Sequence, residues 1–302
     1  MVIGPEDIKA FRQWLGETGR TRATIDSYAR DAASFLEFAR RYSIPTGDFC
    51  PETLLQYSDH LRHDLGEREN SVRRKVIGIR QFFRHLAANK RLPATPFDDA
   101  PIPKRLDLLP GQLNYEKILN MIRQPTSRSA LKKTRDRSIL SLLAFEGLKV
   151  GEIISLEWGD LMQAGDSAVL RINGTHGRVI HLGEQTAAAL RSYATEIKKE
   201  IAESGSTRRM FVGFKGRDGA RILPQMTRHG LKFMLYEEGR KAGISQLNTE
   251  RLRHFSIEYQ FQNGKSAEEI MNHLGLRRPG IVGRHLSKLR RSVVHERDYG
   301  NP

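Results

Sequence analysis

The chain has 302 residues, of which 38% are hydrophobic, enough for a sizeable core and, at this length, for two domains of ordinary size. Lys and Arg number 50 against 35 Asp and Glu, so the formal net charge is +15, which favours a polyanionic partner and nucleic acid first. A single cysteine, Cys50, excludes an internal disulfide framework and a cysteine-rich zinc site. The sequence shows neither a secretory signal nor the run of about 18 apolar residues that a membrane span needs, which predicts a soluble, cytoplasmic and nucleoid-associated protein without a membrane partner.

Residues 1–92 are predicted to form a helical domain. A first apolar stripe at helical spacing covers 28–42, behind Thr21 or Thr24 as the candidate N-cap. A second stripe covers 76–86. Basic side chains surround this second stripe at Arg73, Arg74, Lys75, Arg80 and Arg84. A solvated face is the simpler interpretation of such a run, but the large excess of basic over acidic residues favours a surface for the DNA backbone.

A proline-rich segment separates two parts of different charge. Five prolines fall between Pro93 and Pro110, a density that no helix tolerates, so residues 93–112 are predicted to be a linker. Residues 1–105 carry 18 Lys and Arg against 14 Asp and Glu, whereas the rest carries 32 against 21. Because basic residues lie on both sides of the linker, we expect both parts to contact the polyanion.

The C-terminal part mixes helices with a β-hairpin. Residues 138–155 have a helical pattern that breaks at Gly147. The runs 168–172 and 178–182 are rich in β-forming residues and enclose a Gly-containing loop, which predicts a hairpin. Further helical patterns cover residues 184–203, 225–242, 249–262 and 266–275.

Several short motifs occur in a fixed order along the chain. They lie at residues 24–28, 79–86, 135–137, 146–156, 241–244 and 252–254. In their order and spacing the chain resembles the tyrosine recombinase (phage integrase) family, and its Xer-like members most. The resemblance implies a mainly α fold with a small β-sheet (α+β). It also implies a C-shaped clamp on double-stranded DNA, made of a helical core-binding domain over 1–92 and a catalytic-type domain over 113–285, with a C-terminal tail at 286–302. No cofactor and no metal are expected, and the expected partners are duplex DNA with further copies of the chain or active recombinases bound to it.

The family's chemistry uses six side chains. A tyrosine attacks a DNA phosphate, two arginines and a His or Trp hold its oxygens, a hairpin lysine protonates the leaving oxygen and a further histidine helps to move the proton. The resemblance aligns these positions, in chain order, with Lys149, Asn173, Glu250, Arg253, Leu276 and His285. Because Arg253 alone keeps the family's residue, the sequence predicts a catalytically degenerate, DNA-binding member in a recombination or integration context, and no residue is assigned a catalytic role.

The remaining cations of the motifs are candidates for phosphate contacts. The residues predicted to bind DNA are Lys149, Arg253, His254, Arg73, Arg74, Lys75 and Arg80. Glu250 opposes cleavage, because a carboxylate about 5 Å from a phosphate repels it by about 3 kcal/mol at an effective dielectric constant of about 20. We expect Glu250 either to exert this repulsion or to pair with Arg251 or Arg253 and neutralise the site.

Two other functions stay open at this point. The first is a working recombinase whose nucleophile is displaced to Tyr299, replaced by His285 or supplied by a partner. The second is a protein-interaction scaffold whose basic charge is incidental. The tail at 286–302 is predicted to dock on a neighbouring subunit, since the family commonly exchanges this segment between subunits.

Overall fold

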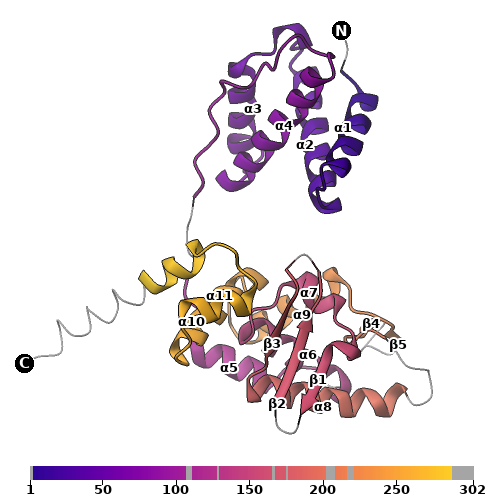
Figure 1. Cartoon of the computed structure of the whole chain (residues 1–302), viewed down its shortest axis with the longest axis vertical. Coiled ribbons are helices and arrows are strands. Elements are labelled where there is room, and N and C mark those ends of the chain that lie inside the picture. Colours follow the sequence, from indigo (N-terminus) through magenta and orange to yellow (C-terminus); the bar gives the residue numbers. More distant parts are fainter. Residues whose placement is uncertain are drawn as a thin grey trace, which may run out of the picture. The chain divides into compact units, whose positions relative to one another are not determined.

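The computed structural model describes residues 3–106, 111–127, 129–164, 167–174, 176–201, 208–215 and 221–287 (Figure 1). The chain forms two compact units, Met1–Leu108 and Leu109–Pro302. The boundary between them falls inside the proline-rich segment. Helices dominate and the sheets are small, which confirms the predicted fold class.

The first unit is helical. Its α-helices are α1 (Pro5–Glu17), α2 (Arg22–Arg41), α3 (Pro51–His63) and α4 (Glu69–Ala88). The hydroxyl of Thr21 accepts a hydrogen bond from the backbone N–H of Thr24, so Thr21 is the N-cap of α2. Gly78 lets α2 and α4 approach closely, because a Cβ there would lie 3.1 Å from both Asp31 Oδ2 and a Tyr28 ring carbon.

An aromatic cluster fills the core of this unit. The rings of Phe35, Phe83 and Phe97 meet edge to face, with centroids 4.6 to 5.7 Å apart. Phe97 and Ala100 are buried although they belong to the segment 93–112, which was predicted to be a linker. This part of the segment therefore packs on the first unit, since an aromatic side chain among the prolines gives it a core contact that proline density does not reveal.

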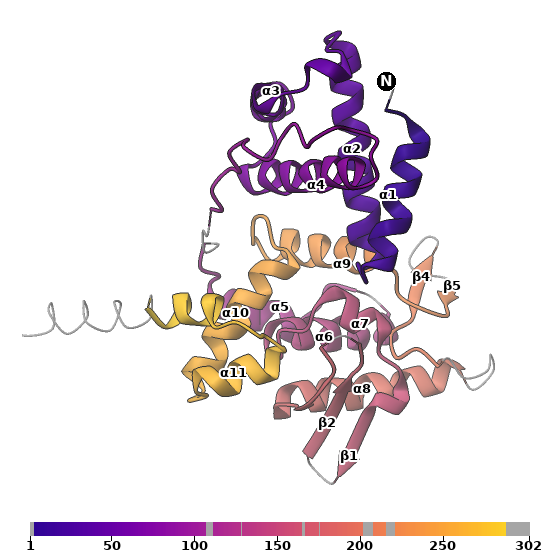
Figure 2. The ribbon, with the colours of Figure 1, turned by 45° about the horizontal axis from the view of Figure 1, so that its top comes forward.

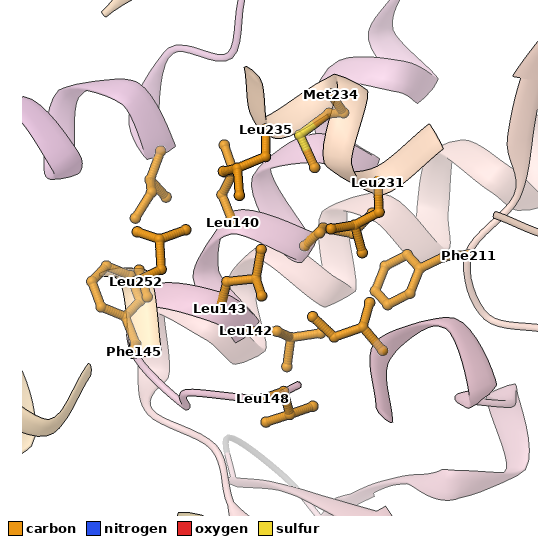
Figure 3. Packing of buried hydrophobic residues seen from close by; sticks show 14 of the residues in the cluster. Leu140, Leu142, Leu143, Phe145, Leu148, Phe211, Leu231, Met234, Leu235 and Leu252 are labelled. Carbon is orange, nitrogen blue, oxygen red and sulfur yellow. The ribbon is translucent and has the colours of Figure 1, made fainter. Parts of the chain in front are cut away.

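The second unit packs helices around α6. Its α-helices are α5 (Tyr115–Arg123), α6 (Ala130–Ala144), α7 (Val150–Ser155), α8 (Glu184–Ile201), α9 (Arg228–Lys241), α10 (Thr249–Gln262) and α11 (Ala267–Leu274). Residues 280–287 are also helical. Helix α6 lies against α8 in both views (Figures 1 and 2), and all of its residues from Ser138 to Ala144 are buried. Figure 3 shows Leu140 and Leu143 of α6 among Leu235 of α9 and Leu252 of α10.

Two antiparallel sheets complete the second unit. The larger has the order β1-β2-β3, and the smaller pairs β4 with β5. Their strands are β1 (Leu161–Ala164), β2 (Ser167–Ile172), β3 (Arg178–His181), β4 (Gly213–Lys215) and β5 (Arg221–Leu223). Strands β2 and β3 form the predicted hairpin, with Leu170 opposite Ile180. Strand β1, which pairs with the other edge of β2, was not predicted, and neither were β4 and β5.

The helix predicted at 138–155 begins earlier than expected. It is split into α6 and α7 at Gly147, as predicted, but α6 starts at Ala130 after the N-cap Ser129. Its first turns are polar and show no apolar periodicity. No helix among the described residues is long and apolar enough to cross a membrane. Most of the predicted tail, residues 288–302 with Tyr299, lies outside the described residues.

Candidate functional site

The turn between α6 and α7 positions the residues of the site. Gly147 has a φ angle of +64°, and a Cβ there would lie 2.4 Å from a side-chain carbon of Leu274 and 2.8 Å from Ser256 Oγ. A larger residue would therefore push against both α10 and α11. The carbonyl oxygen of Gly147 accepts a hydrogen bond from the Arg253 guanidinium. This tight turn brings the start of α7 next to the middle of α10.

Arg253 on α10 is 7% exposed and is held before any ligand arrives. Besides the Gly147 carbonyl, it donates to the carbonyl of Leu274 at 2.9 Å. A guanidinium has more N–H donors than these two bonds use, so donors remain for a phosphate oxygen. Burial lowers the pKa of Arg253, with help from the charge of Arg178, although the nearby Glu152 opposes the shift.

Two cations pair with the carboxylate of Glu152, and the charge of a third interacts with it. Lys149, the N-cap of α7, donates its backbone N–H to Glu152 Oε2 at 2.8 Å and places its ammonium 3.9 Å from Oε1. Arg178 of β3 donates to both carboxylate oxygens, at 2.9 and 3.3 Å. The charge of Arg253 acts on both Lys149 and Glu152. We call Lys149, Arg178 and Arg253 the cation cluster, and positive charge is in excess there.

The electrostatics of the cation cluster favour an added anion. Burial raises the pKa of Glu152, but the hydrogen bonds from Arg178 and the Lys149 backbone outweigh it, and the pKa of Glu152 lies below its usual value. Burial lowers the pKa of the Lys149 ammonium, and repulsion from Arg253 and Arg178 adds to this against the attraction of Glu152. A phosphate oxygen placed here would relieve that repulsion.

Sequence analysis missed Arg178. Arg178 is the first residue of the predicted strand at 178–182. A basic side chain at the start of that strand was the signal that could have identified it. Its Nε donates to the carbonyl of His273 at 2.6 Å, so it also ties β3 to α11.

A pocket of about 680 Å³ lies between β3 and α11 and includes Arg178 in its wall. Its lining includes these basic and imidazole side chains: His176, Arg178, His181, Lys265, His273 and Arg277. Glu269 is the carboxylate among the lining residues. The pocket extends the positive surface of the cation cluster along the edge strand β3.

The position that the resemblance gives to the nucleophile holds a buried histidine. His285, in the helix at 280–287, is 1% exposed. Its Nε2 lies 2.6 Å from His254 Nδ1, and its Nδ1 lies 3.1 Å from Glu258 Oε1. Both ring nitrogens are therefore engaged, and neither is presented to solvent.

Glu250 does not form the expected ion pair with Arg251 or Arg253. Its Oε1 faces His254 Nε2 at 3.4 Å, and the hydrogen bond from His254 lowers the pKa of Glu250. Arg251 donates to backbone carbonyls instead. His254, predicted to bind DNA, is buried with its two ring nitrogens directed at Glu250 and His285.

The two other substituted positions have structural partners. Asn173, after β2, donates from Nδ2 to Oδ1 of the buried Asp160 at 2.8 Å. Leu276 packs against a small apolar cluster. The buried members of that cluster are Ile257, Ile270, Leu274 and Val282. Neither the amide of Asn173 nor the apolar side chain of Leu276 can act as a general acid, and Leu276 cannot donate a hydrogen bond.

The basic residues predicted to bind DNA in the first unit already donate hydrogen bonds within it. Arg74 binds the buried carboxylate of Asp31 on α2. Lys75 binds Glu67 Oε1 at 2.6 Å. Both side chains therefore have an intramolecular carboxylate that competes with a phosphate.

Arg73 and Arg80 bind backbone carbonyls, and Arg80 also places its guanidinium 3.8 Å from a carboxylate oxygen of Asp98. Arg73 donates to the carbonyl of Pro103, and Arg80 donates to the carbonyls of Asp98 and Ala100 at 2.7 and 3.0 Å. These bonds attach the segment after α4 to its basic face. The four side chains thus stabilise the first unit, whatever else they bind.

Known proteins resemble the chain over most of its length. The model of the phage integrase family matches residues 112–288. The tyrosine recombinase XerD of Halalkalibacterium halodurans is 27% identical over 285 residues, which cover 92% of each chain. XerD of Rhizobium meliloti is 25% identical, over 88% of this chain and 86% of its own.

Solved structures share the fold. The XerH site-specific recombinase bound to its difH substrate, in a pre-cleavage complex, superposes with a TM-score of 0.63 at 18% identity, over 85% of this chain and 75% of its own. A lambda integrase dimer bound to a core site gives a TM-score of 0.66 at 13% identity, over 92% and 93% of the two chains. Because the family model covers more than half of the sequence, the chain belongs to the phage integrase family, the tyrosine recombinases, and resembles their Xer-like members over most of its length.

Proposed function

We propose that this chain is a member of its family that binds duplex DNA and does not cut DNA by itself. One observation carries the proposal: the position of the nucleophile holds His285, which is 1% exposed and has both ring nitrogens engaged by His254 and Glu258. A covalent protein–DNA intermediate needs a nucleophile that can reach the phosphorus atom. A side chain buried in this way does not meet that need.

DNA binding is supported by the charge of the second unit. The cation cluster gathers three basic side chains around Glu152, and the cationic pocket beside β3 extends it. Of its family, XerH and lambda integrase have been captured on DNA, the latter also as a tetramer on a Holliday junction. We infer that this chain contacts DNA phosphates through the cation cluster, and that several copies or an active recombinase join it there, on DNA of the nucleoid.

The loss of proton donors supports the absence of cleavage. Losing a general acid typically costs about 10²–10⁴ in rate, and losing one donor to a developing oxyanion costs about 10²–10³. Asn173 and Leu276 stand at two such positions and are bonded or packed within the fold. These losses do not multiply, because catalytic groups act as a unit.

The test of cleavage is a nicked suicide duplex carrying the protein's own binding site. We expect no protein–DNA adduct on a denaturing gel with the unmodified chain. His285→Tyr alone should also give none, since Lys149, Asn173, Glu250 and Leu276 remain. The matched comparison is the fivefold variant Lys149→Arg, Asn173→Lys, Glu250→His, Leu276→His and His285→Tyr, which should come closer to activity.

An adduct formed by the unmodified chain would overturn the proposal. If that adduct disappeared in Tyr299→Phe, the chain would be a working recombinase with a displaced tyrosine. If it disappeared in His285→Gln, the buried histidine would be the nucleophile. Either result would replace a DNA-binding role by a catalytic one.

Binding itself is tested by a salt titration on duplex DNA. Counterion release with six phosphate contacts predicts a slope of about −5 for log affinity against log salt. A slope near zero would contradict DNA binding and favour a protein-interaction scaffold.

A further inference from the structure

Four titratable side chains connect α10 to the helix at 280–287. In order they are Glu250, His254, His285 and Glu258, joined by contacts of 3.4, 2.6 and 3.1 Å. We call this group the imidazole clasp. Three of its members are buried: His254 at 7% exposure, His285 at 1% and Glu258 at 8%. The proposed DNA binding gives none of them a task.

The contacts of the imidazole clasp set how many protons it holds. Each of its three contacts needs one N–H, because carboxylate oxygens only accept hydrogen bonds and two bare ring nitrogens repel each other. Two neutral imidazoles supply one N–H each, which is one fewer than the contacts need. All contacts are therefore made when the rings of His254 and His285 hold three protons between them.

We propose that the imidazole clasp is a proton-operated lock, which fixes the helix at 280–287 on α10 while the two rings share one extra proton and releases it when both rings are fully protonated. In the fully protonated state two N–H groups would face each other across the 2.6 Å contact. Both rings would then be cations in a place where His285 has almost no access to water. Such a pair is stabilised only by separation.

The charged groups recorded around the clasp act unequally on its two ends. Glu250, Glu258 and Arg253 all belong to α10, and the charge of Arg253 acts on Glu250. From other elements, Glu152 of α7 and Arg178 of β3 act on Arg253, which in turn acts on Glu250. Glu250 is exposed, so losing the proton between Glu250 and His254 costs little free energy. Acid instead adds a proton at the buried contact between the His254 and His285 rings.

The direction of the pH effect follows from the proton counts. A histidine in water gains its second proton near about pH 6.5. Below that pH the open clasp holds four protons and the closed clasp three, so acid favours the open form. Above that pH the two rings of the open clasp hold two protons, so closing takes up one proton and alkali weakens the lock. This weakening acts only at the exposed end, between Glu250 and His254. The lock is therefore tightest near neutrality and opens mainly in acid.

Hydrogen exchange of the full-length chain without DNA tests the lock. We expect the protection factors of amides in 280–287, corrected for intrinsic exchange, to fall about tenfold or more from pH 7 to pH 5, as for loss of one charged hydrogen bond. Helix α8 in the same protein, which packs on α6 and β2, is the internal control and should keep its protection. Equal protection of 280–287 at the two pH values would overturn the proposal, with no bearing on DNA binding.

A matched pair of variants separates the clasp from general acid effects. His285→Gln supplies an acceptor and a donor that do not titrate, so His254 can be fully protonated without conflict and protection should persist at pH 5. His229→Gln changes an exposed histidine on α9 and should reproduce the parent profile. An unchanged acid loss in His285→Gln would contradict the lock.

Nitrogen NMR of histidine side chains tests the protonation of the clasp directly. At pH 7 the rings of His254 and His285 should show three protonated nitrogens and one bare nitrogen, assigned by the signals missing from single variants. Two bare nitrogens at pH 7 would mean two neutral rings and would overturn the shared proton.

Discussion

The basic face of α4 and the cation cluster of the second unit both contain several positively charged residues, but these residues have different bonding partners. On α4, Arg74 binds the buried Asp31 and Arg80 binds backbone carbonyls. In the cation cluster, Lys149 and its neighbours share Glu152 and leave positive charge in excess. A count of basic residues therefore does not locate a phosphate site. We infer that the carboxylates and carbonyls within reach of each cation decide whether it can bind a phosphate.

The largest expected effect comes from a substitution in the tight turn that positions the cation cluster. Gly147→Ala places a Cβ at a φ of +64° and 2.4 Å from a Leu274 carbon, so we expect a loss of about 3 kcal/mol from backbone strain and overpacking. Urea unfolding measures this loss of stability. The control is Gly243→Ala, which has the same φ but no atom within 4 Å of its Cβ and should lose only the strain. Equal losses in the two variants would show that the contact with Leu274 does not matter.

The second prediction separates stability from binding on α4. Arg74→Ala leaves the buried Asp31 without its cation, and we expect the free energy of unfolding to fall by about 1–3 kcal/mol while the folded protein binds DNA nearly as before. Arg84→Ala, which removes an exposed pair with Asp98, should change stability by less than about 1 kcal/mol. Strongly reduced DNA affinity in a stable Arg74→Ala protein would make α4 a DNA surface after all.

The third prediction concerns the cation cluster, where we expect a loss of DNA affinity and little change in stability. Lys149→Ala should leave unfolding nearly unchanged, because its ammonium is partly exposed and 3.9 Å from Glu152. It should weaken DNA binding uniformly across sequences and reduce the salt slope by about one. Lys199→Ala, at an exposed lysine on α8, is the control and should bind like the parent. An unchanged salt slope in Lys149→Ala would remove Lys149 from the interface.

The smallest expected effect is a pH dependence from Glu152. Its pKa in the folded chain lies below the usual value, so its ionised form stabilises the fold at neutral pH, and this contribution is lost as the pH falls below about 4.5 through the folded pKa. Glu152→Gln should therefore unfold more easily than the parent at pH 7, and the difference should narrow in acid. A difference of the same size at pH 3 and pH 7 would show that Arg178 gains nothing from the charge of Glu152.

Much of the fold could be predicted because local signals agreed with the tertiary structure. The break at Gly147, the hairpin of β2 and β3, and the helices α8 to α11 follow from periodicity, glycine placement and turn chemistry. Strand β1 could not be predicted in the same way, because it is four residues long and depends on pairing with β2. The burial of Phe97 was hidden by the prolines around it.

The sequence by itself determined the family and the excess of positive charge, because these depend on residue identity and order. The substitution of the catalytic positions stays a prediction. The sequence did not determine the partners of the charged groups. That Arg80 holds backbone, that Arg178 joins Lys149, and that His285 is locked between His254 and Glu258 depend on side chains from distant segments. Electrostatic and hydrogen-bond energies change steeply over a few ångströms, so only the tertiary structure decided which positive charges remain in excess and why the nucleophile position is closed.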